Sequence, residues 1–201
     1  MKHLKSLGPI MMAIAVAAAF GAAGASATEL YNGATTMGSG KTLDFSLKSG
    51  TKSVMTETGG STVSECSGST LQTKLTNAGS STTTATSETT AATWSGCTFP
   101  TTTVTKGKLE FHQIAGTTNA RVTIDAEYGA TITTVFFGSC VFGAIAGTDI
   151  GILTNGTPAT IDANAVTVKL SGSAFACPET YKWTATYQVT EPATNLRVEA
   201  S

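Results

Sequence analysis

The chain has 201 residues, with 12 lysines and arginines against 13 aspartates and glutamates, and a formal net charge of −1. This weakly acidic balance, with no basic cluster, excludes the electrostatic footprint of a protein that binds nucleic acid or anionic lipid. The length suits one domain with a single sizeable core, once a targeting segment is removed.

The beginning of the chain has the three parts of a secretory signal peptide. Two lysines form a positive front, residues 10–23 are an apolar run, and the triplet ASA at residues 25–27 is an A-x-A cleavage site. The apolar run is shorter than the roughly 20 residues that a membrane-spanning helix needs. We therefore expect residues 1–27 to be cleaved on export, and residues 28–201 to form a single all-β domain without a transmembrane helix.

The stretch GSGKT at residues 38–42 matches the end of a phosphate-binding loop. That motif needs an earlier glycine, but the residue five positions before Gly40 is Thr35. An alternating stretch follows, where the motif requires a helix. We therefore predict a Gly-Ser turn that enters a strand at residues 42–47, and no nucleotide site.

Alternating apolar and polar residues predict strands along the whole chain. Threonine, which fits a half-exposed pleated surface, occupies 39 positions and supports this prediction. The clearest stretches after the first strand are residues 71–75, 109–111, 121–127, 165–170 and 181–189. About ten to thirteen such strands predict an antiparallel β-sandwich or a small barrel-like sandwich.

Two of these stretches also predict which side chains face the core. In residues 181–189, Tyr181 and Trp183 begin an apolar face that continues to Val189, with threonines and Lys182 opposite. In residues 165–170, we expect Val166, Val168 and Leu170 to point inward.

Residues 80–96, SSTTTATSETTAATWSG, are low in complexity. One interpretation is an exposed stalk, but such stalks are usually rich in proline, and this segment has none. A polar edge strand or a long hairpin that leads to a buried Trp94 is favoured instead.

Four cysteines, Cys66, Cys97, Cys140 and Cys177, follow the expected cleavage site. An even number in an exported chain predicts disulfides, and no C-x-x-C pair or neighbouring histidine indicates a metal site. Three connectivities are allowed. We favour Cys66–Cys97 with Cys140–Cys177, because each half of the chain then has its own cross-link.

Catalysis by histidine would have to use His112, the only histidine after residue 27. It lies on the polar side of a predicted strand, and no G-x-S-x-G elbow occurs, so we expect a solvent-facing side chain. Paired carboxylates leave a polysaccharide hydrolase open, through Glu110, Asp125 and Glu127. We assign no catalytic, cofactor-binding or metal-binding residue.

The C-terminal sequence CPETYKWTATYQVTEPATNLRVEAS combines Cys-Pro, Lys-Trp-Thr-Ala, Tyr-x-Val-Thr and a later proline. Together with residues 94–98 and 147–151, it resembles a group of small secreted bacterial proteins of unassigned function that have a Thr/Gly-rich β body. The resemblance implies secretion and a disulfide-linked β fold, and it implies no activity.

The sequence thus predicts a secreted protein, in the periplasm, outside the cell or at the cell surface. Its single β domain is expected to act without catalysis, as a binding or structural module whose ligand the sequence does not identify. Partners other than nucleic acid remain open as well, including a surface polymer and a second copy of the chain. A pilin-like assembly subunit is the first alternative, with residues 28–39 as a mobile donor strand, and the hydrolase is the second.

Overall fold

The computed structural model describes residues 28–57, 59–134, 138–171, 177–193 and 195–200. The expected signal peptide, residues 1–27, lies outside this part of the chain. The described residues form strands β1 to β15 and no helix, which confirms the all-β prediction. Accordingly, none of the described segments is a helix with the length and apolar character needed to cross a bilayer.

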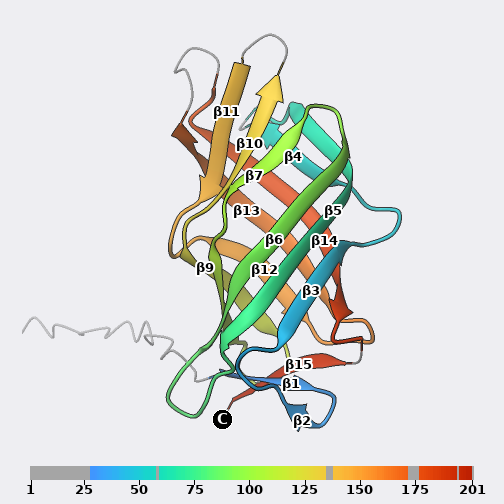
Figure 1. Ribbon diagram of the computed structural model, residues 1–201, viewed down its shortest axis with the longest axis vertical. Helices are drawn as coiled ribbons and strands as arrows, with labels where there is room; N and C mark the ends of the chain where they lie inside the picture. Colours follow the sequence, from blue (N-terminus) through green and yellow to red (C-terminus); the bar gives the residue numbers. More distant parts are fainter. Residues whose placement is uncertain (1–27, 58, 135–137, 172–176, 194, 201) are drawn as a thin grey trace, which may run out of the picture.

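The strands from β3 to β14 form one antiparallel sheet that closes on itself (Figure 1). β14 (Thr180–Glu191) pairs with β13 (Thr160–Ser171) on one side. On its other side β14 pairs with both β3 (Thr42–Leu47) and β4 (Ser53–Glu57), each along a different part of its length. β5 (Thr62–Asn77) pairs with both β3 and β4 and so completes the closure. The predicted barrel-like sandwich is confirmed.

The remaining strands extend the sheet from β5 in its lower half and from β13 in its upper half. In the lower half, as oriented in Figure 1, the order after β5 is β6 (Ala85–Cys97), β8 (Lys108–Gln113), β9 (Ala120–Ala126) and β12 (Asp149–Thr154). In the upper half, β13 pairs with β11 (Gly138–Ala144), followed by β10 (Tyr128–Thr134) and β7 (Thr101–Thr105).

A small three-stranded sheet covers the lower end of the closed sheet (Figure 1). It consists of β1 (Thr28–Asn32), β2 (Thr35–Thr36) and β15 (Leu196–Ala200). Leu30 of β1 is fully buried and belongs to the main core. The expectation that residues 28–39 form a mobile donor strand is therefore wrong. These residues fold back on their own chain, because β15 already supplies β1 with a hydrogen-bonding partner.

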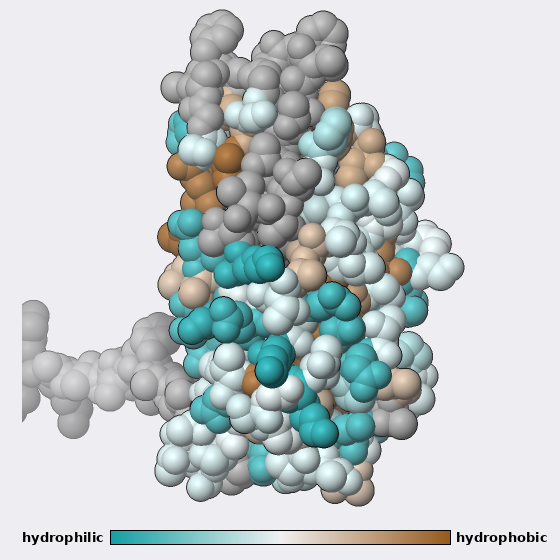
Figure 2. Space-filling model, viewed as in Figure 1, coloured by the Kyte–Doolittle hydropathy of each residue, from teal (hydrophilic) through white to brown (hydrophobic). Residues whose placement is uncertain are grey.

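Most predicted core faces are confirmed by the pattern of burial. Leu109, Phe111, Val122 and Ile124 are buried, and so are the predicted inward positions of β14 other than Trp183. The turn at residues 38–40 leads directly into β3, as predicted for GSGKT. The polar faces carry threonines that bond to one another across β5 and β6, and Figure 2 shows a largely pale, weakly polar surface over these strands.

The predicted inward face of residues 165–170 is wrong. Val166 is 59% exposed, whereas Ala163, Ala165 and Thr167 are buried. On β14, Trp183 lies directly opposite Ala165, and opposite residues of an antiparallel pair share a face. The large β14 aromatics fill the interior, so small side chains occupy the inward positions of β13 and the larger valine points outward.

Around residues 80–96 the long hairpin is confirmed, since β5 and β6 are consecutive strands that pair along their length, but two other predictions need correction. Over Ala85–Glu88, β6 lies between β5 and β8, so this part of the segment is neither a stalk nor an edge strand. Trp94 and Trp183, both expected to be buried, are half-buried. Their rings meet edge to face, with centroids 6.3 Å apart.

The favoured disulfide pairing is confirmed: Cys66 is bonded to Cys97, and Cys140 to Cys177. The first bond joins ladder partners on β5 and β6. The second lies in a separate buried cluster with Phe142 and Tyr181.

Tyr181 should titrate well above an ordinary tyrosine. Its side chain is 4% exposed and stacks edge to face on Phe142, with ring centroids 4.2 Å apart. Burial, with a smaller contribution from the Glu57 carboxylate, raises the pKa of Tyr181 to about 12. The folded state favours the neutral phenol, so this contribution to stability is complete below the unfolded pKa of about 10 and is lost as the pH rises through about 12.

The check is a spectrophotometric titration of phenolate in the wild type and in Tyr181→Phe. The difference between the two curves should rise near pH 12. A difference that titrates near pH 10, as for a solvated tyrosine, would contradict the burial argument.

Candidate binding groove

A polar groove of about 660 Å³ lies at the lower end, where the three-stranded sheet meets the closed sheet. We call it the lower groove. Its walls come from the end of β1, from β2, from the turn that follows, from the start of β3 and from the end of β14. The residues that matter for its chemistry are Thr35, Thr36, Lys41, Thr42, Asp44 and Glu191.

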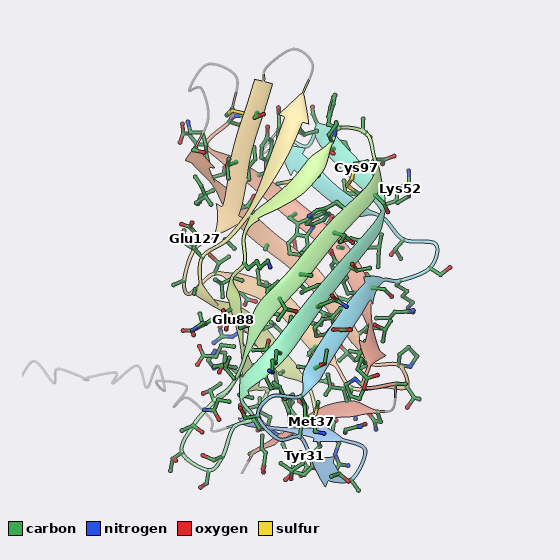
Figure 3. The ribbon with its side chains drawn as sticks, in the orientation of Figure 1. Tyr31, Met37, Lys52, Glu88, Cys97 and Glu127 are labelled. Atoms are coloured by element: carbon green, nitrogen blue, oxygen red, sulfur yellow. A yellow bond between two sulfur atoms is a disulfide. The ribbon has the colours of Figure 1, made fainter. Side chains whose placement is uncertain are left out.

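The local sequence explains how the wall formed by the end of β1 and by β2 is positioned. Gly33 begins the two-residue turn between β1 and β2 with a φ of 61°, a conformation that glycine adopts without steric cost. Met37 then donates its backbone N–H to the Leu30 carbonyl at 2.8 Å, and its side chain is 6% exposed. Figure 3 shows Met37 beside Tyr31 at this end of the molecule. The buried methionine anchors the hairpin over the groove.

The wall that follows is tied to β5 by backbone hydrogen bonds. Gly40 donates to the Leu75 carbonyl at 2.7 Å, and Leu75 donates back to the Lys41 carbonyl at 2.8 Å. These two bonds hold the turn against the closed sheet, so the side chains at the start of β3 reach the groove in a fixed position.

Asp44 is the most informative side chain in the lower groove. Its Oδ2 accepts a hydrogen bond from the Gln72 amide at 3.3 Å. Its Oδ1 is buried and has no hydrogen-bond partner within the described residues. Buried polar atoms are nearly always paired, and a carboxylate oxygen acts only as an acceptor. Asp44 therefore offers an unused acceptor to a ligand that carries hydroxyl or amide donors.

Glu191 adds a second carboxylate to the same wall, because it is the ladder partner of Asp44 across β3 and β14. Lys41 supplies one positive charge, so the charged side chains of the lining have a net charge of −1. The three threonine hydroxyls donate and accept hydrogen bonds. This lining favours a neutral, hydroxyl-rich ligand and repels a polyanion.

Tyr31 pairs with Thr36 across β1 and β2, next to this wall. Its hydroxyl donates to the Glu29 carboxylate at 2.9 Å, and this hydrogen bond is the main cause that raises the pKa of Tyr31. The Arg197 guanidinium lies 5.3 Å from the ring centroid. The ring is thus engaged by a cation, so hydroxyls and carboxylates, rather than aromatic stacking, dominate the groove.

The residues considered for catalysis lie on β8, on β9 and, for Glu127, directly after β9, outside the lower groove. His112 Nε2 is 3.0 Å from Thr123 Oγ1 and 3.3 Å from a Glu110 carboxylate oxygen. The imidazole side chain is 21% exposed, so it is partly covered by these neighbours rather than fully solvent-facing. Asp125 and Glu127 are exposed. In the described part of the chain, no three His, Cys, Asp or Glu side chains are grouped so that they could hold a metal ion.

Sequence reasoning missed the two carboxylates of the lower groove. Asp44 stands in a strand that was predicted, but as one polar position among several. Glu191 is at the end of β14, far away in the sequence. Only the closure of the sheet brings them together, and no local pattern carries that information.

Comparison of the chain with protein-family models, with curated proteins and with solved structures finds no match.

Proposed function

We propose that the protein is an exported, non-catalytic β domain that binds a neutral oligosaccharide or polysaccharide in the lower groove. Export is supported by the expected signal peptide and by the two disulfides, which persist in oxidising compartments. The periplasm, the cell surface and the surrounding medium all meet this condition. The binding site rests on one observation, the unpaired Asp44 Oδ1 in the wall of a groove of about 660 Å³.

A neutral glycan suits this wall for three reasons. Its many hydroxyls match both the carboxylate acceptors and the threonine hydroxyls. Its lack of charge avoids repulsion by Asp44 and Glu191. A groove of this size is also within the range of 300–1,000 Å³ that is usual for ligand sites.

A polysaccharide hydrolase is the second candidate, because two carboxylates face each other across one ladder in this groove. Glycoside hydrolases use two carboxylates on either side of the scissile bond. The relevant pair is then Asp44 and Glu191, in place of Glu110, Asp125 and Glu127. Chromatography of the sugar after long incubation with the protein separates the two candidates, since binding alone leaves the chain length unchanged.

Replacing Asp44 by asparagine should weaken glycan binding by about tenfold or more, because hydrogen bonds to charged groups contribute about 1.5–3 kcal/mol. Titration calorimetry with neutral hexasaccharides of glucose, xylose and N-acetylglucosamine measures the affinity, and dextran sulfate serves as the charged comparison. Asn retains an oxygen that accepts from Gln72, so the fold should be preserved.

The matched control is Asp125→Asn, which removes an exposed carboxylate on β9. It should leave the affinity unchanged. Equal affinities for Asp44→Asn, Asp125→Asn and the wild type would remove the lower groove as the site, and preference for dextran sulfate would reverse the assigned ligand class.

A further inference from the structure

We infer that the interior of the closed sheet is a second binding site, for a slender, mainly aliphatic molecule that carries one hydroxyl or carbonyl group. This inference is independent of the proposed function, because the interior walls and the lower groove share no residue. Two features carry it: a pair of small apolar cavities, and one unpaired buried hydroxyl in the wall of each.

The two cavities lie inside the sheet. The upper cavity has a volume of about 50 Å³ and apolar walls that include Met55 and Phe142. The lower cavity has about 40 Å³ and walls that include Phe45 and Leu109. An apolar cavity of about 150 Å³ takes benzene, so each of these is too small for an aromatic ring but wide enough for a few methylene groups.

Three side chains, Trp94, Ile150 and Trp183, line both cavities and therefore separate them. Trp183 is held in place by its indole N–H, which donates to Ser53 Oγ at 2.9 Å. Both tryptophans are half-buried. A thin chain that passes the edge-to-face pair would fill both cavities and cover both rings.

Ser64 in the upper cavity and Thr89 in the lower cavity supply the polar contacts. They are 4% and 2% exposed, and within the described residues their hydroxyls have no hydrogen-bond partner. Another interior serine is paired, since Ser69 Oγ lies 2.8 Å from the Tyr187 hydroxyl. Leaving a buried hydroxyl unpaired costs about 1–3 kcal/mol, and a ligand hydroxyl or carbonyl group would recover this energy.

The direct test uses 1-hexanol as the probe and n-hexane as its apolar match. The chain has only two tryptophans, and both line the cavities, so tryptophan fluorescence excited selectively over tyrosine reports on this site. We expect 1-hexanol to change the emission of the full-length mature protein saturably. Crystals pressurised with xenon should show xenon in the cavities of the wild type, which requires no variant to fold.

The hydroxyl contacts are tested with the double variant Ser64→Ala, Thr89→Val. Loss of a neutral hydrogen bond should weaken 1-hexanol binding about threefold to tenfold and leave n-hexane binding unchanged. The matched control is Ser67→Ala, on the exposed face of the same strand β5. It should bind both probes as the wild type does.

Three outcomes would overturn the inference. A fluorescence change that never saturates, together with empty or water-filled cavities under xenon, would show that the cavities hold water only. Equal affinity for 1-hexanol in the double variant and in the wild type would show that the hydroxyls are not ligand contacts. Competition between 1-hexanol and a hexasaccharide would show that the two sites are not independent.

Discussion

Replacing Cys140 and Cys177 together by alanine is expected to lower the free energy of unfolding by about 4 kcal/mol. The bond closes a loop with a sequence separation of 37 residues, and opening it restores that entropy to the unfolded chain. Both sulfurs are buried beside Phe142 and Tyr181, so alanine also leaves space in this cluster. Urea denaturation without reductant measures the loss.

The second disulfide provides the comparison for this prediction. Cys66–Cys97 spans 31 residues, and its removal by alanine should therefore cost nearly as much. Against a typical stability of about 5–15 kcal/mol, loss of both bonds should unfold much of the population. An unchanged urea midpoint in either double variant would show that the cross-link does not limit the unfolded chain.

Replacing Gly79 by alanine should destabilise the protein by about 3 kcal/mol or more, because it combines backbone strain with a steric clash. Gly79 has a φ of +89°, and a Cβ atom at this position would lie 1.6 Å from the Thr28 carbonyl oxygen. Relief of the clash requires β1 to move away from the loop after β5. Thermal unfolding measures the loss, and faster amide exchange at Leu30, which donates to the Ala78 carbonyl at 3.2 Å, would locate it.

Gly116→Ala separates the two causes. Gly116 has a φ of +75°, and a Cβ atom there would meet nothing within 4 Å. This variant should be destabilised only by the backbone strain of an alanine in the left-handed region, which costs about 1–2 kcal/mol. Equal losses in both variants would mean that the contact between Gly79 and β1 contributes nothing.

The strands were predictable from sequence where one face is plainly apolar. Tyr181 and Trp183 fix the inward face of β14, because only that side can bury aromatic rings. The adjacent β13 has apolar residues on both faces. The alternation of residues along a strand therefore does not tell whether Val166 or Ala165 faces the core. The volume of the facing β14 side chains decides, and this is a property of the pairing between the strands.

The disulfide pairing and the lower groove together show which contacts sequence reasoning can predict and which it cannot. Cys66 and Cys97 are ladder partners on strands that follow each other along the chain, so a preference for neighbouring cysteines succeeds. Asp44 and Glu191 are also ladder partners, but their strands meet only where the sheet closes. Contacts between successive strands are thus accessible to sequence reasoning, whereas contacts across the closure require the whole topology.

The pairing of Thr28 with Ala200 has a consequence for how the molecule is completed. A polypeptide delivered from its N-terminus presents β1 first and β15 last, so β1 can pair with β2 at once but must wait for nearly the entire chain before it pairs with β15. Successive strands such as β5 and β6, or β8 and β9, have nearby partners and pair earlier, since short loops close at lower entropic cost. We therefore expect the pairing of β1 with β15 to form late, and a chain truncated before Leu196 leaves the apolar side of β1 uncovered.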